Sequence, residues 1–250
     1  MKNIRSNILT RKTLEDALLS QNIVHEHEQY KHSLQEQFLP VLSILQLTLF
    51  GLLGWWVHRH PLLPVDVTIT RKLQRNQSPI LRYGMIILSL LNEHHFLNVL
   101  TIPIAVIFWR RRLRLEAVMM VGSTILSNVF RKLFHNIVNR PRPHPPLVKV
   151  IQQASNNQSF PSGHVLGSVL FWGWLIAFRR FLLAKRDKHQ KALLSIPALF
   201  LTLIGPSRVY LGDHWTTDVV GGYLLGSGWL ALCISLYYAL KRAMSRADRS

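Results

Sequence analysis

The chain has 250 residues, of which 48% are hydrophobic and only 17% carry charge, and its formal net charge is +18. This length fits a single domain, and the excess of positive charge favours an anionic partner. So apolar a composition excludes a basic nucleic-acid-binding module, because the faces of such a module are solvated and polar. The single cysteine, Cys233, excludes an intramolecular disulfide and a cysteine-based zinc site.

Apolar runs along the chain predict membrane-spanning helices. The first covers residues 38–57, twenty positions without Asp, Glu, Lys or Arg, which matches the ~20 residues that cross ~30 Å of hydrocarbon as a helix. Because a polar stretch precedes this run, we expect a retained span rather than a cleaved signal peptide. Five more spans are predicted, at 96–109, 115–130, 161–178, 192–206 and 219–240.

The predicted fold is an all-α bundle of six transmembrane helices that fills residues 38–240. A polar segment at 1–37 precedes this membrane domain, and a basic tail at 241–250 follows it. An even number of spans puts both termini on the same side of the membrane. The loops on that side hold nineteen Lys and Arg residues and the loops on the other side hold eleven, so the positive-inside bias predicts that both termini are cytoplasmic.

The loops on the non-cytoplasmic side contain two further features. Residues 64–81 mix apolar and charged side chains, which predicts a short interfacial helix between the first two spans. Six of the eleven positive charges on this side fall in two other segments, 131–160 and 205–216, which also collect Pro, Gly, His and Asp. Because these charges oppose the positive-inside bias, they indicate a function other than setting the topology.

The first of three segments suited to phosphate follows the third predicted span. In Arg140-Pro141-Arg142-Pro143 the prolines hold the backbone extended and direct the guanidinium groups, whose paired donors match phosphate oxygens. Anchoring to anionic lipid headgroups explains the same residues. This segment alone leaves both interpretations open.

The second segment, Phe160-Pro161-Ser162-Gly163-His164, opens the fourth predicted span. A helix N-terminus attracts anions through its free N–H groups, and Ser162 adds a hydroxyl. Gly163 lets a ligand approach the backbone, and His164, with an ordinary pKa of ~6.5, can protonate a leaving oxygen. The alternative is an ordinary serine cap beside an incidental interfacial histidine.

The third segment, residues 206–218, opens the last predicted span and contains Arg208, Asp213, His214 and Asp218. His214 and Asp218 are four residues apart, so on a helix they share a face, and the carboxylate can orient the imidazole as a nucleophile. The alternative for this pair is a helix-start aspartate with an interfacial histidine. We expect Asp213 to be a solvated loop carboxylate, although it would tune the pKa of His214 if it were close to the imidazole. Three such segments at one membrane face favour a common anion site.

These segments resemble the signature of the type 2 phosphatidic acid phosphatase superfamily, which comprises integral-membrane lipid phosphatases. That signature is Lys-x6-Arg-Pro, then Pro-Ser-Gly-His, then Ser-Arg-x5-His. The second motif is intact at 161–164 and the third at 207–214, and the resemblance covers roughly residues 83–240. The intervals between the motifs also look typical of the family.

The first motif departs from the family pattern. When Arg142 serves as its arginine, the lysine position holds His135, and Lys132 lies one helical turn earlier. Arg140, which is also followed by proline, offers a competing register. We expect Lys132 to supply the missing cation, with His135 as its substitute, because a lysine side chain is long enough to bridge much of one turn.

The resemblance implies a metal-independent phosphohydrolase without a cofactor, which acts on the non-cytoplasmic face of a plasma membrane or bacterial inner membrane. It implies that His214, oriented by Asp218, attacks phosphorus to form a phosphohistidine and that His164 protonates the departing alcohol. The residues implied to bind phosphate are Arg142, Arg208, Lys132, His135, Ser162 and Gly163.

The implied substrate is a lipid phosphate held among membrane lipids. No short motif separates phosphatidate, phosphatidylglycerol phosphate, a polyprenyl diphosphate and a sphingoid phosphate. Two other functions fit the same residues, namely a non-catalytic protein that binds or transports lipid phosphates and a vanadate-dependent haloperoxidase-like enzyme. Six hydrophobic spans count against the haloperoxidase.

Overall fold

The computed structural model describes residues 37–152, 157–182 and 189–247, so most of the predicted N-terminal segment lies outside the described residues. The described residues form α-helices and no β-strand. One isolated β-bridge joins Pro141 and Gln158. In chain order the helices are Gln37–Arg59, α2 (Pro64–Leu73), α3 (Pro79–Leu91), α4 (His94–Arg110), α5 (Arg114–Val138), α6 (Gly163–Leu182), α7 (His189–Tyr210) and α8 (Thr216–Ala247).

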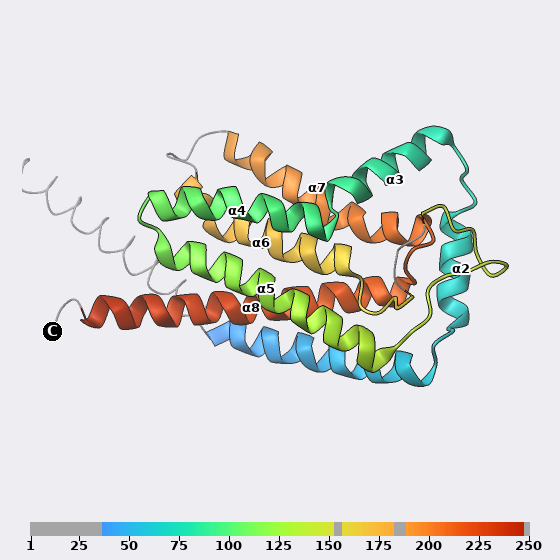
Figure 1. Ribbon diagram of the computed structural model, residues 1–250, viewed down its shortest axis with the longest axis horizontal. Helices are drawn as coiled ribbons and strands as arrows, with labels where there is room; N and C mark the ends of the chain where they lie inside the picture. Colours follow the sequence, from blue (N-terminus) through green and yellow to red (C-terminus); the bar gives the residue numbers. More distant parts are fainter. Residues whose placement is uncertain (1–36, 153–156, 183–188, 248–250) are drawn as a thin grey trace, which may run out of the picture.

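The long helices lie side by side along the long axis of the molecule, with α2 and the connections after α5 and α7 gathered at one end (Figure 1). Helix α6 is central, because it packs against α4, α5, α7 and α8. Its Trp174 is fully buried and donates a hydrogen bond of 2.7 Å to Ser123 Oγ of α5. The prediction of an all-α bundle is confirmed.

Helices α6 and α8 approach each other closely because glycines of α8 face α6. A Cβ atom on Gly222 would lie 2.9 Å from the carbonyl oxygen of Ser162, and one on Gly226 would lie 3.0 Å from Val169 Cβ. Small residues of this kind allow helix backbones to pack tightly. As a result, the first turns of α6 and α8 lie next to each other.

Two helices are long and apolar enough to cross a bilayer, the helix Gln37–Arg59 and α8. Helices α3 and α4 pass the same test as a pair, bent by 47° at the break between them. By this criterion the described residues contain two or three candidate spans, where the sequence predicts six. Helix α5 includes charged residues near both of its ends, and the apolar part of α6, Gly163–Phe178, is short.

The surface of the bundle is apolar along the length of several helices. Large side chains that stay exposed include Leu45, Leu52, Ile102, Ile125 and Leu199. Exposed apolar surface of this extent is typical of contact with lipid. Together with the candidate spans, it identifies an integral membrane protein.

The short helix predicted between the first two spans is present as α2, which is shorter than the predicted 64–81. It begins with Pro64 at its first turn and ends at Leu73, and a second proline, Pro79, starts α3. Helix α3 was not predicted, because the second predicted span begins only at residue 96. The Gln74 side chain fixes the end of α2, because its amide nitrogen donates to the carbonyl oxygens of Lys149 (2.7 Å) and Tyr210 (2.9 Å).

Candidate active site

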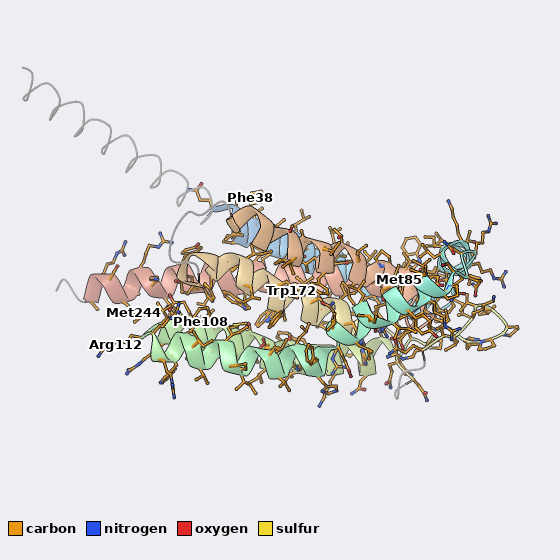
Figure 2. The ribbon with its side chains drawn as sticks, turned by 90° about the horizontal axis from the view of Figure 1, so that it is seen from above. Phe38, Met85, Phe108, Arg112, Trp172 and Met244 are labelled. Carbon is orange, nitrogen blue, oxygen red and sulfur yellow. The ribbon has the colours of Figure 1, made fainter. Side chains whose placement is uncertain are left out.

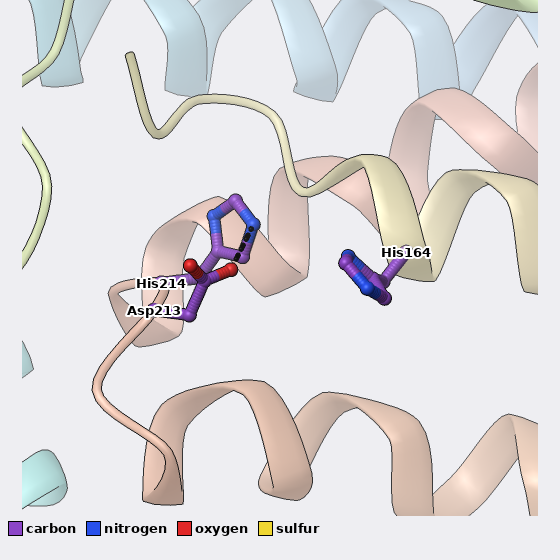
Figure 3. A group of neighbouring side chains, drawn as sticks. All are labelled: His164, Asp213 and His214. Carbon is purple, nitrogen blue, oxygen red and sulfur yellow. Dashed lines mark ion pairs between the residues drawn. The ribbon is translucent and has the colours of Figure 1, made fainter. Parts of the chain in front are cut away.

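The three segments singled out by the sequence meet at one end of the bundle. The Ser162 N–H donates to the carbonyl oxygen of Asp218 at 3.1 Å, which joins the start of α6 to the start of α8. Arg142, in the connection after α5, donates to the carbonyl oxygen of Asp213 at 2.7 Å. Figure 3 shows His164 on α6 beside Asp213 and His214. The ligating atoms of these three side chains lie within 4.8 Å of one another.

Arg208 and His214 are held by a tight turn between α7 and α8. The backbone N–H groups of Asp213 (3.2 Å) and His214 (3.3 Å) both donate to the carbonyl oxygen of Arg208. Gly212 makes this turn possible, because its φ is +70° and a Cβ atom there would collide with the backbone of Lys149. The side chains of Arg208 and His214 are buried.

Asp213 occupies the centre of the site. One carboxylate oxygen lies 3.0 Å from Arg142 Nη1, and the other pairs with Arg208 and lies 3.1 Å from His214 Nε2. Only 2% of Asp213 is exposed. The expectation of a solvated loop carboxylate was therefore wrong, because two guanidinium groups compensate the cost of burying this charge.

Asp218 lies on the other side of the imidazole. Its Oδ2 is 3.7 Å from His214 Nδ1, which is longer than a hydrogen bond, and accepts the N–H of Trp215 at 2.8 Å. The second oxygen, Oδ1, pairs with Arg140 at 2.6 Å. Thus Nδ1 of His214 faces Asp218, while Nε2 faces Asp213 and lies 3.5 Å from Arg142 Nη1.

Burial and charge set the protonation of this turn. Burial lowers the pKa of His214 below its ordinary 6.5 and outweighs Asp213 and Asp218, which raise it. Burial alone would raise the pKa of Asp213, but His214, Arg208 and Arg142 hold that pKa well below its usual value. At neutral pH the site therefore contains a neutral imidazole next to an ionised carboxylate.

The start of α6 contains a polar group that lacks a partner. Ser162 is fully buried, and its Oγ has no hydrogen-bond partner among the described residues. Buried hydroxyl groups are normally satisfied in folded proteins. At the N-terminus of α6, an anionic oxygen would satisfy both this hydroxyl and the first N–H groups of the helix.

Three basic side chains on the last turns of α5 differ in whether they reach the start of α6. Arg131 packs on Gly163, since a Cβ atom there would be 2.8 Å from Arg131 Cδ, and its Nε is buried without a hydrogen-bond partner in the described chain. His135 is buried, with Nε2 3.1 Å from the carbonyl oxygen of Pro161. Lys132 is exposed. The structure thus brings His135 to the site and leaves Lys132 on the surface.

Arg131 was not among the residues predicted to bind phosphate, although its spacing from His135 indicated it. Arg131 and His135 are four residues apart and so share one face of α5, whereas Lys132 is rotated away from that face. The structure also separates the two competing arginines. Arg140 is buried against Asp66 and Asp218, and Arg142 is the one that reaches Asp213 and His214.

A cavity of about 620 Å³ adjoins the site. Arg142 and Asp213 form part of its wall, and His144, Gln152 and Asn157 add further polar groups. Gln152 also connects the cavity to Arg208, whose Nη1 lies 3.2 Å from the amide oxygen. The cavity is therefore continuous with the groups that pair with Asp213.

The side chains of His164, Asp213 and His214 are also of the type and spacing that hold metal ions. Both carboxylate oxygens of Asp213 already pair with arginine, and a cation placed here would face the guanidinium groups of Arg142 and Arg208. Repulsion between like charges opposes such binding. The charge of the site favours an anion.

Comparisons with known proteins agree with this geometry. The sequence model of the PAP2 superfamily matches residues 116–242. The chain is 28% identical over 178 residues to phosphatidylglycerophosphatase B of Bacillus subtilis, a match that covers 71% of this chain and 85% of that protein. It is 27% identical over 169 residues to the undecaprenyl-diphosphatase of Sulfolobus acidocaldarius, covering 66% of this chain and 75% of that protein.

A solved structure has the same fold. The crystal structure of a transmembrane PAP2 type phosphatidylglycerolphosphate phosphatase from Bacillus subtilis superposes with a TM-score of 0.67 at 27% identity, covering 80% of this chain and 98% of that one. The family match spans half of the chain and includes the second and third motifs. The chain therefore belongs to the PAP2 superfamily.

Proposed function

We propose that this enzyme removes phosphate from a lipid phosphate or diphosphate through a phosphohistidine on His214, without a metal ion. Membership of the PAP2 superfamily and the phosphatase relatives make the chain a lipid phosphate hydrolase. One observation supports the mechanism most strongly. Arg142, Arg208 and His214 Nε2 all converge on the single carboxylate of Asp213, which is the arrangement needed around one phosphate group.

In the first step, the phosphate takes the place of the Asp213 carboxylate between the two arginines. Neutral His214 attacks through Nε2, so a P–N bond forms as the P–O bond to the lipid breaks. His164 donates a proton to the departing oxygen, which belongs to an alcohol when the substrate is a monophosphate and to a lipid phosphate when it is a diphosphate. The proton on Nδ1 of His214 stays there and faces Asp218, which stabilises the positive charge that develops on the ring.

In the second step, water attacks phosphorus, and His164 takes up the proton that the water loses. The P–N bond breaks, and inorganic phosphate and neutral His214 are released. The electron pairs and protons balance over the two steps, so the residues named supply all the acid–base chemistry. Arg142 and Arg208 neutralise the charge that gathers on the phosphoryl oxygens in both transition states.

The start of α6 completes the phosphate site. Ser162 Oγ and the Gly163 N–H would donate to a phosphoryl oxygen at the positive end of the helix dipole. Arg131 adds a third guanidinium group from α5, in the place for which the sequence suggested Lys132. His135 acts indirectly, because its contact with the carbonyl oxygen of Pro161 fixes the residue that precedes Ser162.

We further propose six spans, formed by the helix Gln37–Arg59, the bent pair α3–α4, and α5, α6, α7 and α8. In Figure 1 the C-terminal end of α8 and the turn between α4 and α5 lie at the end away from α2. Arg112 and Met244 are likewise remote from Met85 in Figure 2, and Met85 accepts a hydrogen bond from Ser207, beside Arg208. Basic residues near the far end support a cytoplasmic location for it and a non-cytoplasmic active site.

The substrate remains in the bilayer during this reaction. Its terminal phosphate lies among the arginines, the rest of its polar headgroup lies in the polar cavity beside Arg142, and its tail stays in lipid. The relatives are named for phosphatidylglycerophosphate and undecaprenyl diphosphate, which supports both a monophosphate and a diphosphate as candidates.

Phosphate release from purified protein tests the proposal. The substrates are phosphatidate, phosphatidylglycerol phosphate, a polyprenyl diphosphate and a sphingoid phosphate, each assayed with and without EDTA and beside the His214→Ala variant. We expect release from at least one substrate, no effect of EDTA, and none from the variant. Binding of these lipids without any release would instead indicate a non-catalytic binding or transport protein.

A further inference from the structure

A buried network of charges connects α2 to the active site. Arg140 lies between two carboxylates, with Nη2 2.7 Å from Asp66 Oδ2 and Nη1 2.6 Å from Asp218 Oδ1. The side chains of all three residues are at most 1% exposed. Arg140 also donates through Nε to the carbonyl oxygen of Pro61 at 2.8 Å. Its guanidinium group is therefore fixed from three directions.

Asp66 also holds the first turn of α8. The Thr217 N–H donates to Asp66 Oδ1 at 3.0 Å, and the Thr217 hydroxyl donates to Oδ2 at 2.7 Å while accepting from Arg140 at 2.6 Å. The first N–H groups of a helix have no partner within the helix. Here a carboxylate from a different helix satisfies one of them, so α2 anchors the start of α8 next to Asp218.

Stability alone does not explain this network. Burying three charged side chains carries a large desolvation cost, and apolar packing of similar volume is often at least as stable. Two carboxylates also share one guanidinium group, which leaves one negative charge in the network. Asp218 carries part of that charge on Oδ2, the oxygen that faces His214 Nδ1.

We propose that Asp66 and Arg140 are positioning residues that hold Asp218, and through it the imidazole of His214, in the orientation for attack on phosphorus. This inference rests on the proposed function. It also gives α2 a role, because Asp66 contributes to the site from a helix that lies outside the bundle of long helices. Asp66 bonds to Thr217 of α8, to Arg140, and to Thr70 within its own helix.

The variant Asp66→Asn tests this inference through kcat and KM. Asparagine has nearly the same shape as aspartate but no charge, so the contacts of residue 66 with Arg140 and Thr217 weaken and Asp218 is no longer held in one position. Arg142 and Arg208 keep their positions. We expect kcat to fall about 10- to 100-fold, because small misplacements of reacting groups have effects of this size. KM should stay within about threefold, since the phosphate clamp is unchanged.

The pH profile adds a readout that a purely structural role would not change. Asp66→Asn removes negative charge and should move the acidic limb of kcat/KM to lower pH, whereas Arg140→Gln leaves two carboxylates uncompensated and should move it to higher pH. The other titratable or charged groups around His214 remain the same in both variants; they are Asp213, Arg208, Arg142, His164 and His135. Shifts of the acidic limb in opposite directions in these two variants would therefore show that the charge of the network acts on His214.

Glu116→Gln is the matched control. Glu116 is another buried carboxylate, which accepts from Tyr237 at 2.7 Å and pairs with Lys241 at 3.1 Å, between α5 and α8. Neutralising it should lower thermal stability and leave kcat per folded molecule and the pH profile unchanged. A loss of kcat in Asp66→Asn but not in this control supports positioning.

A second variant covers the case in which Asp66→Asn does not fold. Thr217→Val removes the hydroxyl link and keeps the backbone N–H and all charges, so kcat should fall several-fold with an unchanged acidic limb. If folded Asp66→Asn or Thr217→Val keeps wild-type kcat on a substrate that the parent hydrolyses, the inference is wrong while the proposed function stands. If the parent hydrolyses none of the four lipids, the proposed function itself fails.

Discussion

The two ends of the bundle each contain a cluster of charged groups around a buried carboxylate, and the clusters differ in how completely their polar atoms are hydrogen-bonded. Around Glu116, the carboxylate, the Tyr237 hydroxyl and the Lys241 ammonium bond one another. Among the described residues, the buried side-chain polar atoms that lack a hydrogen-bond partner are at the other end, with the exception of Gln46 Oε1. Apart from Asp213 Oδ1, which pairs with Arg142, they are Arg131 Nε, Ser162 Oγ, Arg208 Nε, His214 Nδ1 and Thr216 Oγ1.

This difference separates a structural cluster from a binding site. A satisfied cluster joins two helices and gains nothing from a ligand. Unsatisfied buried groups are costly, and a ligand that bonds to them recovers part of that cost. Activity should therefore depend on residues at the end with α2 and should be insensitive to changes around Glu116.

The largest effect is expected for the nucleophile. His214→Ala should lower phosphate release by at least about 10³-fold, because removal of a group that reacts covalently eliminates the route rather than weakening it. The measurement is release from detergent-solubilised lipid phosphate. Radiolabelled phosphate should also remain covalently attached to the parent after denaturation in alkali, in which a P–N bond survives, and not to this variant. Full activity in His214→Ala would remove the mechanism altogether.

The next effect concerns the arginine clamp. Arg208→Gln should lower kcat by about 10²- to 10³-fold, since a fixed donor to the transition-state charge is lost. KM should change less than kcat, because charge on the phosphoryl oxygens increases in the transition state. A change confined to KM would show that Arg208 only binds the ground state. Arg111→Gln, at the exposed turn after α4, is the matched control and should behave like the parent.

Adjacent residues on α5 offer a sharper comparison. Arg131→Ala should reduce kcat/KM by about 10-fold or more, because it removes a charge-assisted hydrogen bond to the phosphate. Lys132→Ala should change kcat/KM less than twofold, because its side chain is exposed. Equal losses of kcat/KM in the two variants, or a larger loss in Lys132→Ala, would instead indicate that Lys132 supplies the cation, as the sequence predicted.

A smaller effect is expected on the pH dependence. His214 must be neutral to attack, and its lowered pKa places the acidic limb of kcat/KM below pH 6.5. Asp213 raises the pKa of His214, so Asp213→Asn should move this limb further down. Because the substrate ionises identically with both proteins, the difference between the two profiles reports the imidazole. A shift to higher pH would contradict the assignment.

The smallest effect is expected at the satisfied cluster. Lys241→Met removes an ammonium that is 47% exposed, so the loss of stability should not exceed about 1 kcal/mol. For a protein of this size that corresponds to a decrease in Tm of about 2–4 °C. Phosphate release should be unchanged. A large loss of activity would show that the two ends of the bundle are coupled.

The sequence was sufficient for those parts of the site that depend on local spacing. His214 lies just before α8 and Asp218 in its first turn, and Ser162 and Gly163 lie at the start of α6, so a few neighbouring residues determine their geometry. The all-α fold followed in the same way from apolar runs. These features require no knowledge of which helices pack together.

Other parts depend on tertiary contacts that the sequence does not show. Asp213 is buried only because Arg142 and Arg208 arrive from two separate segments. Asp66 reaches Thr217 from a position 151 residues earlier in the chain. The choice between Arg131 and Lys132 depends on which face of α5 meets α6. The bend between α3 and α4 is a further feature of this kind. It divides a possible membrane span into two helices that pass the length and hydropathy test only together.

The carboxylate of Asp213 has a consequence for selectivity among anions. Because this carboxylate pairs with both guanidinium groups and cancels one of their two positive charges, chloride or bicarbonate entering from the medium would gain little by displacing it. In the proposed mechanism a doubly charged phosphate ester would bring more charge and more acceptor oxygens to the same donors, and so would displace the carboxylate more readily. On this mechanism, the Asp213 side chain would exclude weakly charged anions from the site before the lipid tail makes any contact.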